Sequence, residues 1–289
     1  MILVALTARA SDTITLGVLE EIPSRYVGES PSRAVRVVFH KQGREWQPFP
    51  SDCPDQACLK TIASKYPPTA TWTIAISGRN LGQLTAATPK EFEYYSSVGL
   101  QNITSNDPVP TIGKRSADFA GFLATPVLRP LIADSQPYYK DPDSWKPSSP
   151  SPELAASMRL AFRKKFPKVS NCSPRDGSTA KPWPYRDADI KINKAYASNK
   201  GWSAVQLLLT GRNRCEGPID DPFIDQWFAV TPHGETIFLG QDMWLVDAGD
   251  YDNDGKSKLV FAINRYNQGG YELFYDDFKS HAAFHFSYH

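Results

Sequence analysis

The sequence predicts a mainly β protein built from antiparallel hairpin units, arranged as a β-propeller-like fold or a β-sandwich with a few short helices. Strand-like runs recur along the chain, and a glycine-containing turn follows most of them. Helical signals are few and do not alternate with the strand signals, as a parallel α/β fold would require. The hairpins share a tryptophan and glycine pattern at uneven intervals, which suggests divergent repeats of one β unit.

Each predicted hairpin has apolar residues on both sides of a turn. In the second hairpin, Trp72, Ile74 and Ile76 occupy alternate positions before the turn "SGRN", so they are expected to face the core. The tail "AAFHFSYH" likewise places Phe284, Phe286 and Tyr288 on one face of a strand. In chain order, the hairpins are expected over residues 34–49, 70–86, 188–210, 225–240 and 258–278.

One long helix and two short ones are predicted. The segment 151–166 begins with Ser and Pro, carries Glu153 in its first turn, and has apolar residues at helical spacing until Pro167 ends it. Residues 55–66 and 89–98 are the shorter candidates. We expect strand to exceed helix, with 151–166 as the longest helix.

The chain divides by composition into four parts. Residues 1–10 end in an A-x-A box and are either the remnant of a signal peptide or a first strand. Residues 11–134 are a β-rich N-terminal part, and 135–170 combine a Pro/Ser-rich loop with the long helix. Residues 171–289 form a β-rich C-terminal part. The parts after residue 10 are also compatible with one continuous domain.

Composition excludes some classes of partner. The formal net charge is +1, which provides no global field to attract nucleic acid or an anionic membrane. No window reaches the ~18 apolar residues that a membrane-spanning helix needs. We therefore expect no nucleic-acid partner and no integral membrane segment.

The four cysteines suggest an oxidising compartment. An even count favours disulfides, and Cys53–Cys58 and Cys172–Cys215 are the expected pairs. Zinc is less consistent with these spacings, because neither pair has the C-x2-C spacing of a zinc ribbon or finger. Free thiols remain the other alternative. Disulfides together with the A-x-A box predict a secreted or periplasmic protein.

The segment "DAGDYDNDGKSKLVF" contains the strongest candidate for an ion site. Asp250, Asp252 and Asp254 alternate, Gly255 permits a tight reversal, and the carbonyl of Lys256 offers a fourth oxygen. Such hard oxygen ligands suit calcium. The segment is not an EF-hand, because the position of the final bidentate acid is Phe261.

This loop resembles the calcium-loop repeats of the FG-GAP and VCBS type, found in integrin-like β-propellers and in many secreted bacterial proteins. The resemblance covers about fifteen residues, and it implies a calcium ion that stabilises a β unit. The whole chain also resembles uncharacterised exported bacterial proteins, which implies no activity. Where these repeats usually carry Asp or Glu, this chain has Lys258. Either Lys258 turns away and Asp247 replaces the missing ligand, or Lys258 neutralises the carboxylates and no metal binds.

The sequence identifies no catalytic residue. The acid pairs Asp220/Asp221 and Asp276/Asp277 are candidates for a hydrolase, but pairs of this kind are common in turns. Loop aromatics are expected either to stack on a sugar or, more simply, to anchor the loops on the sheets; they are Tyr138, Tyr139, Trp145, Trp183 and Tyr185. We therefore expect a binding or structural module with a protein or carbohydrate ligand. The alternative is a carbohydrate-active or other hydrolase that uses loop carboxylates.

Overall fold

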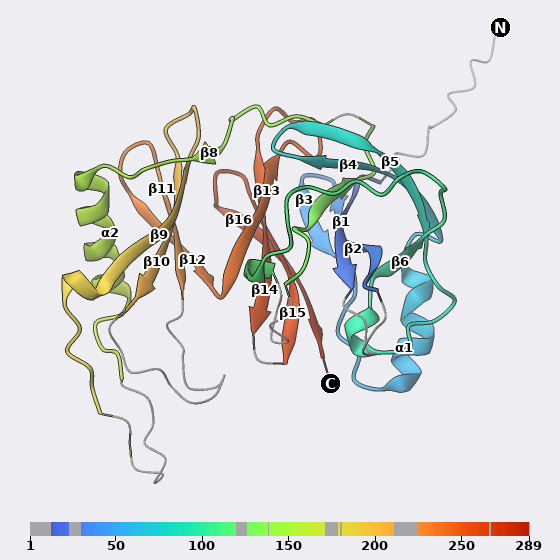
Figure 1. Ribbon diagram of the computed structural model, residues 1–289, viewed down its shortest axis with the longest axis horizontal. Coiled ribbons are helices and arrows are strands. Elements are labelled where there is room, and N and C mark those ends of the chain that lie inside the picture. The colour runs from blue at the N-terminus through green and yellow to red at the C-terminus, as the bar shows by residue number, and fades with distance from the viewer. Residues whose placement is uncertain are drawn as a thin grey trace, which may run out of the picture.

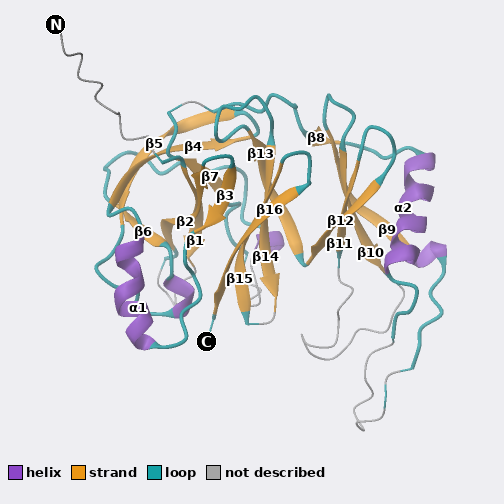
Figure 2. Ribbon diagram, turned by 180° about the vertical axis from the view of Figure 1, so that it is seen from behind, coloured by secondary structure: helices purple, strands orange, loops and turns teal. Residues whose placement is uncertain are grey.

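The computed structural model describes residues 13–22, 30–119, 126–137, 139–170, 179, 181–210, 225–265 and 267–288. Strands make up 47% of the structure and the sheets are antiparallel, so the predicted mainly β class is confirmed. The elements lie in a row (Figure 1): a helix, a five-stranded sheet, a four-stranded sheet and a barrel with a second helix at its far side. Figure 2 shows the same row from behind.

The N-terminal part forms a closed barrel of six strands. Its strands, in the order in which they hydrogen-bond, are β1 (Thr15–Ile22), β7 (Leu131–Asp134), β4 (Thr69–Ile76), β5 (Arg79–Ala87), β6 (Leu100–Ile103) and β2 (Ser32–Gln42). The barrel closes because β1 pairs with both β7 and β2. Closure removes the sheet edges that an open sheet leaves unpaired. β3 (Glu45–Pro48) lies outside the ring and extends the sheet beyond β2.

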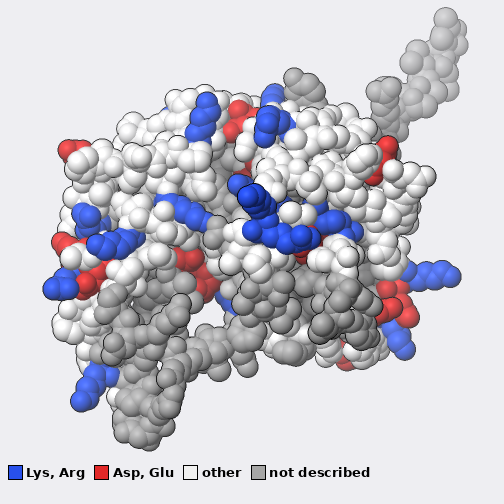
Figure 3. All heavy atoms as spheres, viewed as in Figure 1, with Lys and Arg blue, Asp and Glu red and all other residues white. Residues whose placement is uncertain are grey.

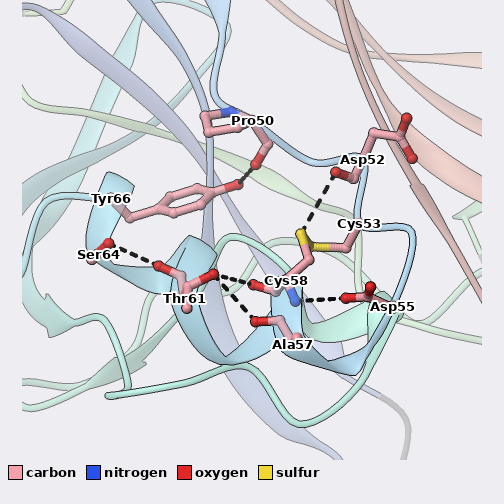
Figure 4. The surroundings of a disulfide bond; sticks show 9 residues. All are labelled: Pro50, Asp52, Cys53, Asp55, Ala57, Cys58, Thr61, Ser64 and Tyr66. Atoms are coloured by element: carbon pink, nitrogen blue, oxygen red, sulfur yellow. Dashed lines mark hydrogen bonds between the residues drawn. A yellow bond between two sulfur atoms is a disulfide. The ribbon is translucent and has the colours of Figure 1, made fainter.

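A short helix and a disulfide follow β3. Helix α1 (Gln56–Ile62) begins at Asp55, whose side chain accepts a hydrogen bond from the Cys58 N–H at 2.9 Å. Cys58 is joined to Cys53, as Figure 4 shows, which confirms the first predicted disulfide. The second predicted pair, Cys172–Cys215, lies outside the described residues.

The five-stranded sheet carries the longer helix on its outer face. Its strands, in order, are β12 (Thr236–Gln241), β11 (Gln226–Val230), β10 (Ser203–Leu209), β9 (Ile190–Ala197) and β8 (Lys146–Pro147). Helix α2 (Pro152–Lys165) is capped by Ser151 and buries Met158 and Phe162 against apolar residues of this sheet. It is the longer of the two α-helices, as predicted. Short 3₁₀ helices occur at Ala63–Lys65, Tyr95–Ser97, Ala117–Phe119 and Asp187–Asp189.

The four-stranded sheet lies in the middle and is buried on both faces. It is a meander of β13 (Met243–Gly249), β14 (Lys258–Arg265), β15 (Gln268–Tyr275) and β16 (Ser280–Ser287). Successive side chains of a strand point to opposite faces, so Val260 joins the core of the barrel while Leu259 and Phe261 pack toward the five-stranded sheet. Trp72, Ile74 and Ile76, which the sequence predicts to face the core, are all buried.

The surface agrees with the near-neutral composition. Figure 3 shows Lys and Arg scattered among uncharged residues on the face seen in Figure 1, with several gathered near its middle and with Asp and Glu between them. Within the described ranges, no helix combines the length and the apolar character needed to cross a membrane.

Candidate functional site

The aspartate loop joins β13 to β14 on the side of the sheet that faces the barrel. Its first residue, Asp250, is fully buried, and its N–H donates to the carbonyl of Lys140 at 2.8 Å. Tyr251 is also fully buried, and its ring stacks on that of Tyr139 with 5.8 Å between centroids. Tyr251 belongs to the apolar cluster of the barrel. It thereby fixes the start of the loop against the barrel.

Local hydrogen bonds bend the loop so that its carboxylates converge. The Asp250 carboxylate accepts from the N–H of Asp254 at 3.0 Å and from the N–H of Gly255 at 2.9 Å. Asn253 and Gly255 adopt left-handed backbone conformations, with φ of 56° and 84°. Asparagine and glycine are the residues that adopt this conformation most readily, which explains their place in the turn.

Asp250, Asp252 and Asp254 form a triad that could hold a metal ion. One carboxylate oxygen from each lies within 4.8 Å of the others. Asp250 is fully buried and the Asp252 side chain is 1% exposed, whereas Asp254 reaches solvent. In number and type, these ligands suit a hard cation that prefers oxygen.

The ammonium group of Lys258 lies at the centre of this triad. Its Nζ is 3.2 Å from Asp250 Oδ1 and 2.5 Å from Asp254 Oδ1, and it also donates to Asp252. A fourth oxygen, the carbonyl of Lys256, lies 3.0 Å away. The side chain is only 2% exposed. Of the two arrangements that the sequence left open, the structure has the one in which Lys258 points into the loop.

Two further lysines approach the triad from outside the loop. Lys41, at the end of β2 in the barrel, forms an ion pair with the second carboxylate of the triad, Asp252. Lys140 Nζ, from the segment after β7, lies 3.6 Å from Asp250 Oδ2. Three carboxylates thus meet three ammonium groups, and the charge of the site is balanced within the chain. The same contacts link the barrel to the four-stranded sheet.

The ionisation of the site follows from these pairs. Burial raises the pKa of Asp252, but hydrogen bonds from Lys258 and Lys41 outweigh it and leave that pKa below its ordinary value. Burial lowers the pKa of Lys258, but hydrogen bonds to Asp252 and Asp254 outweigh it and leave that pKa above its ordinary value. At neutral pH both partners are therefore charged.

Asp247, the substitute ligand predicted from the sequence, does not belong to the converging group. Its carboxylate accepts from the hydroxyls of Tyr139 and Tyr251 and from the N–H of Ser77 at 2.7 Å. Burial, only partly offset by these hydrogen bonds, raises the pKa of Asp247 to about 7. The Asp247 carboxylate therefore links β13 to the barrel, and its oxygens already accept hydrogen bonds from these donors.

Sequence reasoning missed Lys41, Lys140 and Asp134. Both lysines are distant in sequence from the loop, and no local motif relates them to it. Asp134, at the end of β7, is fully buried, and its Oδ2 has no hydrogen-bond partner among the described residues. Burial and the nearby carboxylates of the triad raise the pKa of Asp134 well above its ordinary value. Only the closed barrel brings these residues near the loop.

The other candidate groups are engaged or buried. Asp276 and Asp277 both pair with Lys256, at 3.4 Å and 3.3 Å. The other acid pair, Asp220/Asp221, and Tyr138 lie outside the described residues. Among the loop aromatics, Tyr139, Trp145 and Tyr185 are buried, and Trp183 is half-buried. They anchor loops, as the simpler interpretation predicts.

Comparison with protein-family models, with curated proteins and with solved structures finds no match to this chain.

Proposed function

We propose that the chain is a binding and structural β module of an exported protein, in which Lys258 closes the aspartate loop in the position that calcium takes in loops of the FG-GAP and VCBS type. The observation that carries this proposal is the buried Lys258 ammonium, which contacts all three carboxylates and the Lys256 carbonyl. The loop then stabilises the contact between the barrel and the four-stranded sheet without an added ion.

Calcium binding is the competing account, and the donor set supports it in part. Calcium takes six to eight oxygens at about 2.3–2.6 Å, and the three aspartates with the Lys256 carbonyl would supply four of them. Lys258 does not fit that account, because a cation cannot be a ligand of another cation and its side chain would have to leave the loop. The ammonium is buried, so its displacement would leave it without its carboxylate partners.

Thermal melts with calcium and with chelator test the proposal. We expect the wild-type protein to melt at the same temperature in both, because its site is already neutralised. Lys258→Glu removes the competing ammonium and adds the missing acid, so calcium at about 100 times its Kd should stabilise this variant by about 2.7 kcal/mol.

Lys256→Glu is the matched control. It makes the same charge change in the same loop, but its ammonium pairs with Asp276 and Asp277 and not with the triad. We expect it to show no comparable response to calcium. A wild-type melting temperature that rises with calcium and falls with chelator would show that calcium holds the native loop.

The hydrolase alternative has one observation in its favour. Asp143, Asp277 and Trp145 line a common cleft, so acids and an aromatic residue do meet. The cleft encloses only about 10 Å³, however, which is roughly the space of one water molecule. Lys200 also pairs with Asp143 at 2.5 Å. This geometry supports binding and structural roles better than catalysis on a sugar.

The proposed secreted or periplasmic location is supported by the Cys53–Cys58 disulfide. Disulfides persist in oxidising compartments and are rare in reducing ones. Alkylation of the protein purified from its native cells, without reductant, tests this: Cys53 and Cys58 should remain unmodified in an intact-mass spectrum.

A further inference from the structure

The free edge of the four-stranded sheet has unused backbone groups. Among the strands that the structure describes, β16 is the last of its sheet and pairs only with β15. The Tyr288 N–H donates to the Asn267 carbonyl at 3.2 Å, which continues the register Ser287↔Gln268. Hydrogen-bonded and non-bonded pairs alternate along an antiparallel ladder. The backbone groups of Phe286 and Phe284 therefore point to β15, and those of Ser287, His285 and Ala283 point away from it.

The residues that carry these outward groups also line a cleft. Ala283, His285 and Ser287 form one wall of a space of about 340 Å³, which lies at the lower end of the range for ligand pockets. None of their outward N–H or C=O groups has a hydrogen-bond partner in the part of the chain that the structure describes. The cleft thus presents donors and acceptors at a repeat of two residues.

The opposite wall is anchored by a disulfide and carries an acid that has no ion-pair partner among the described residues. It consists of Ser51, Asp52 and Cys53, which follow β3, together with Tyr95. The disulfide to Cys58 in α1 holds this segment in place. In Figure 4, the Asp52 carboxylate points away from the disulfide. Within the described ranges Asp52 has no ion pair, so it would attract a basic group.

We propose that this cleft binds an extended peptide segment, which adds to β16 as a fifth strand and places a Lys or Arg side chain at Asp52. The proposal rests on the proposed binding function and names its ligand class. Strand addition uses main-chain hydrogen bonds for affinity and side-chain contacts for specificity, and the cleft offers both. A carbohydrate would leave the two-residue repeat of backbone groups unused.

A second copy of the chain is a poorer occupant of the same edge. If two β16 edges paired, the wall of residues 51–53 beside each edge would have to enter the cleft of the other copy. A single extended strand brings no such wall with it.

An NMR titration of ¹⁵N-labelled protein with the peptide acetyl-Thr-Val-Lys-Val-Thr-amide tests the proposal. We expect saturable shifts of the Ala283, His285 and Ser287 amide signals. The same peptide N-methylated at every amide, which cannot pair with a strand edge, should not bind. A peptide with Glu in place of Lys should bind at least threefold more weakly because of repulsion by Asp52.

Two variants and a control separate the backbone from the charge contribution. Ala283→Pro removes one outward N–H and leaves the bonds to β15 intact, so we expect a tenfold or greater loss of affinity. Asp52→Asn, at an exposed position, should weaken the lysine peptide several-fold and remove its advantage over the Glu peptide. Asp107→Asn makes the same charge change at an exposed acid that does not line the cleft, and this control should bind as the wild type does.

Three results would overturn the proposal: no saturable shift at these amides, equal binding of the N-methylated peptide, or a dimer that Ala283→Pro dissociates. The wild-type comparison of the two peptides does not depend on whether a variant folds. The calcium melts measure a different part of the molecule, so failure here leaves the account of the aspartate loop standing.

Discussion

At the scale of single residues, the aspartate loop depends on one buried ammonium. A buried charge is costly unless it is paired and hydrogen-bonded, and Lys258 meets this condition with four oxygens. An ammonium has three N–H donors, so at least one of these contacts is shared or purely electrostatic. Removing Lys258 would leave the triad to be neutralised by Lys41 and the half-exposed Lys140 alone.

Lys258→Met should therefore destabilise the protein by about 3–5 kcal/mol, the usual cost of removing one partner of a buried ion pair. Urea denaturation at pH 7 measures this change. Lys256→Met is the control: its half-exposed ion pairs should be worth at most about 1 kcal/mol. Equal stability of the Lys258→Met variant and the wild type would show that the ammonium does not hold the loop.

A second residue-scale prediction concerns Asp225 in the five-stranded sheet. Its carboxylate accepts from the Gln206 side chain and from the Asp242 N–H, both at 2.7 Å. Burial and the nearby Asp242 outweigh these hydrogen bonds and raise the pKa of Asp225 to about 6. The folded state therefore holds this proton more tightly than the unfolded state, whose carboxyl titrates near pH 4.

The contribution of Asp225 to stability is consequently complete below about pH 4 and is lost as the pH rises to about 6, by on the order of 3 kcal/mol. Asp225→Asn removes the titrating group, so its free energy of unfolding should fall less over this interval than that of the wild type. Urea melts at several pH values measure the difference. The exposed Asp107→Asn serves as control and should keep the wild-type profile.

At the scale of elements, the disulfide and the capped helix α1 form one unit. Cys53 and Cys58 close a short loop across the first turn of α1, and the Tyr66 hydroxyl donates to the Pro50 carbonyl at 2.6 Å (Figure 4). In the chain-entropy model, a bond across so short a loop removes less entropy from the unfolded state than a bond across a long loop, but it still stabilises the fold.

The double variant Cys53→Ser, Cys58→Ser should lose about 2 kcal/mol of stability in the chain-entropy model, near the lower end of the effect of native disulfides. Comparison of its urea midpoint with that of the wild type, both without reductant, tests this. A loss above about 5 kcal/mol would contradict the chain-entropy model and would mean that the disulfide also stabilises structure outside the loop that it closes.

Elements with local signals were predictable from the sequence. Helix α2 has a cap at Ser151 and ends before Pro167, and the structure places it at Pro152–Lys165. The β14–β15 hairpin was predicted from its apolar alternation around the turn. The triad of the loop was predicted for the same reason, because Asp250, Asp252 and Asp254 are neighbours in sequence. Its partners Lys41 and Lys140 were not, since only tertiary structure relates them.

At the scale of the whole molecule, the closed barrel could not be predicted. The pairing of β1 with β7 joins residues more than a hundred positions apart. Apolar alternation predicts which face of a strand is buried, but it does not predict which other strand pairs with it. The central position of the four-stranded sheet was not predicted either. The sequence of β14 is consistent with that position, because both faces of this strand are apolar, as a sheet covered on two sides requires.

The doubly covered sheet has a consequence for how the chain reaches its native state. The core of the barrel includes Phe284 and Phe286, which lie in β16, the last strand that the structure describes. A nascent chain that lacks β16 therefore cannot complete the core of the barrel, even when all six barrel strands have been made. Contacts between the two ends of a chain form slowly, because a long loop must close before they gain any free energy. The barrel should thus become fully native only after β16 has been synthesised and has packed against it.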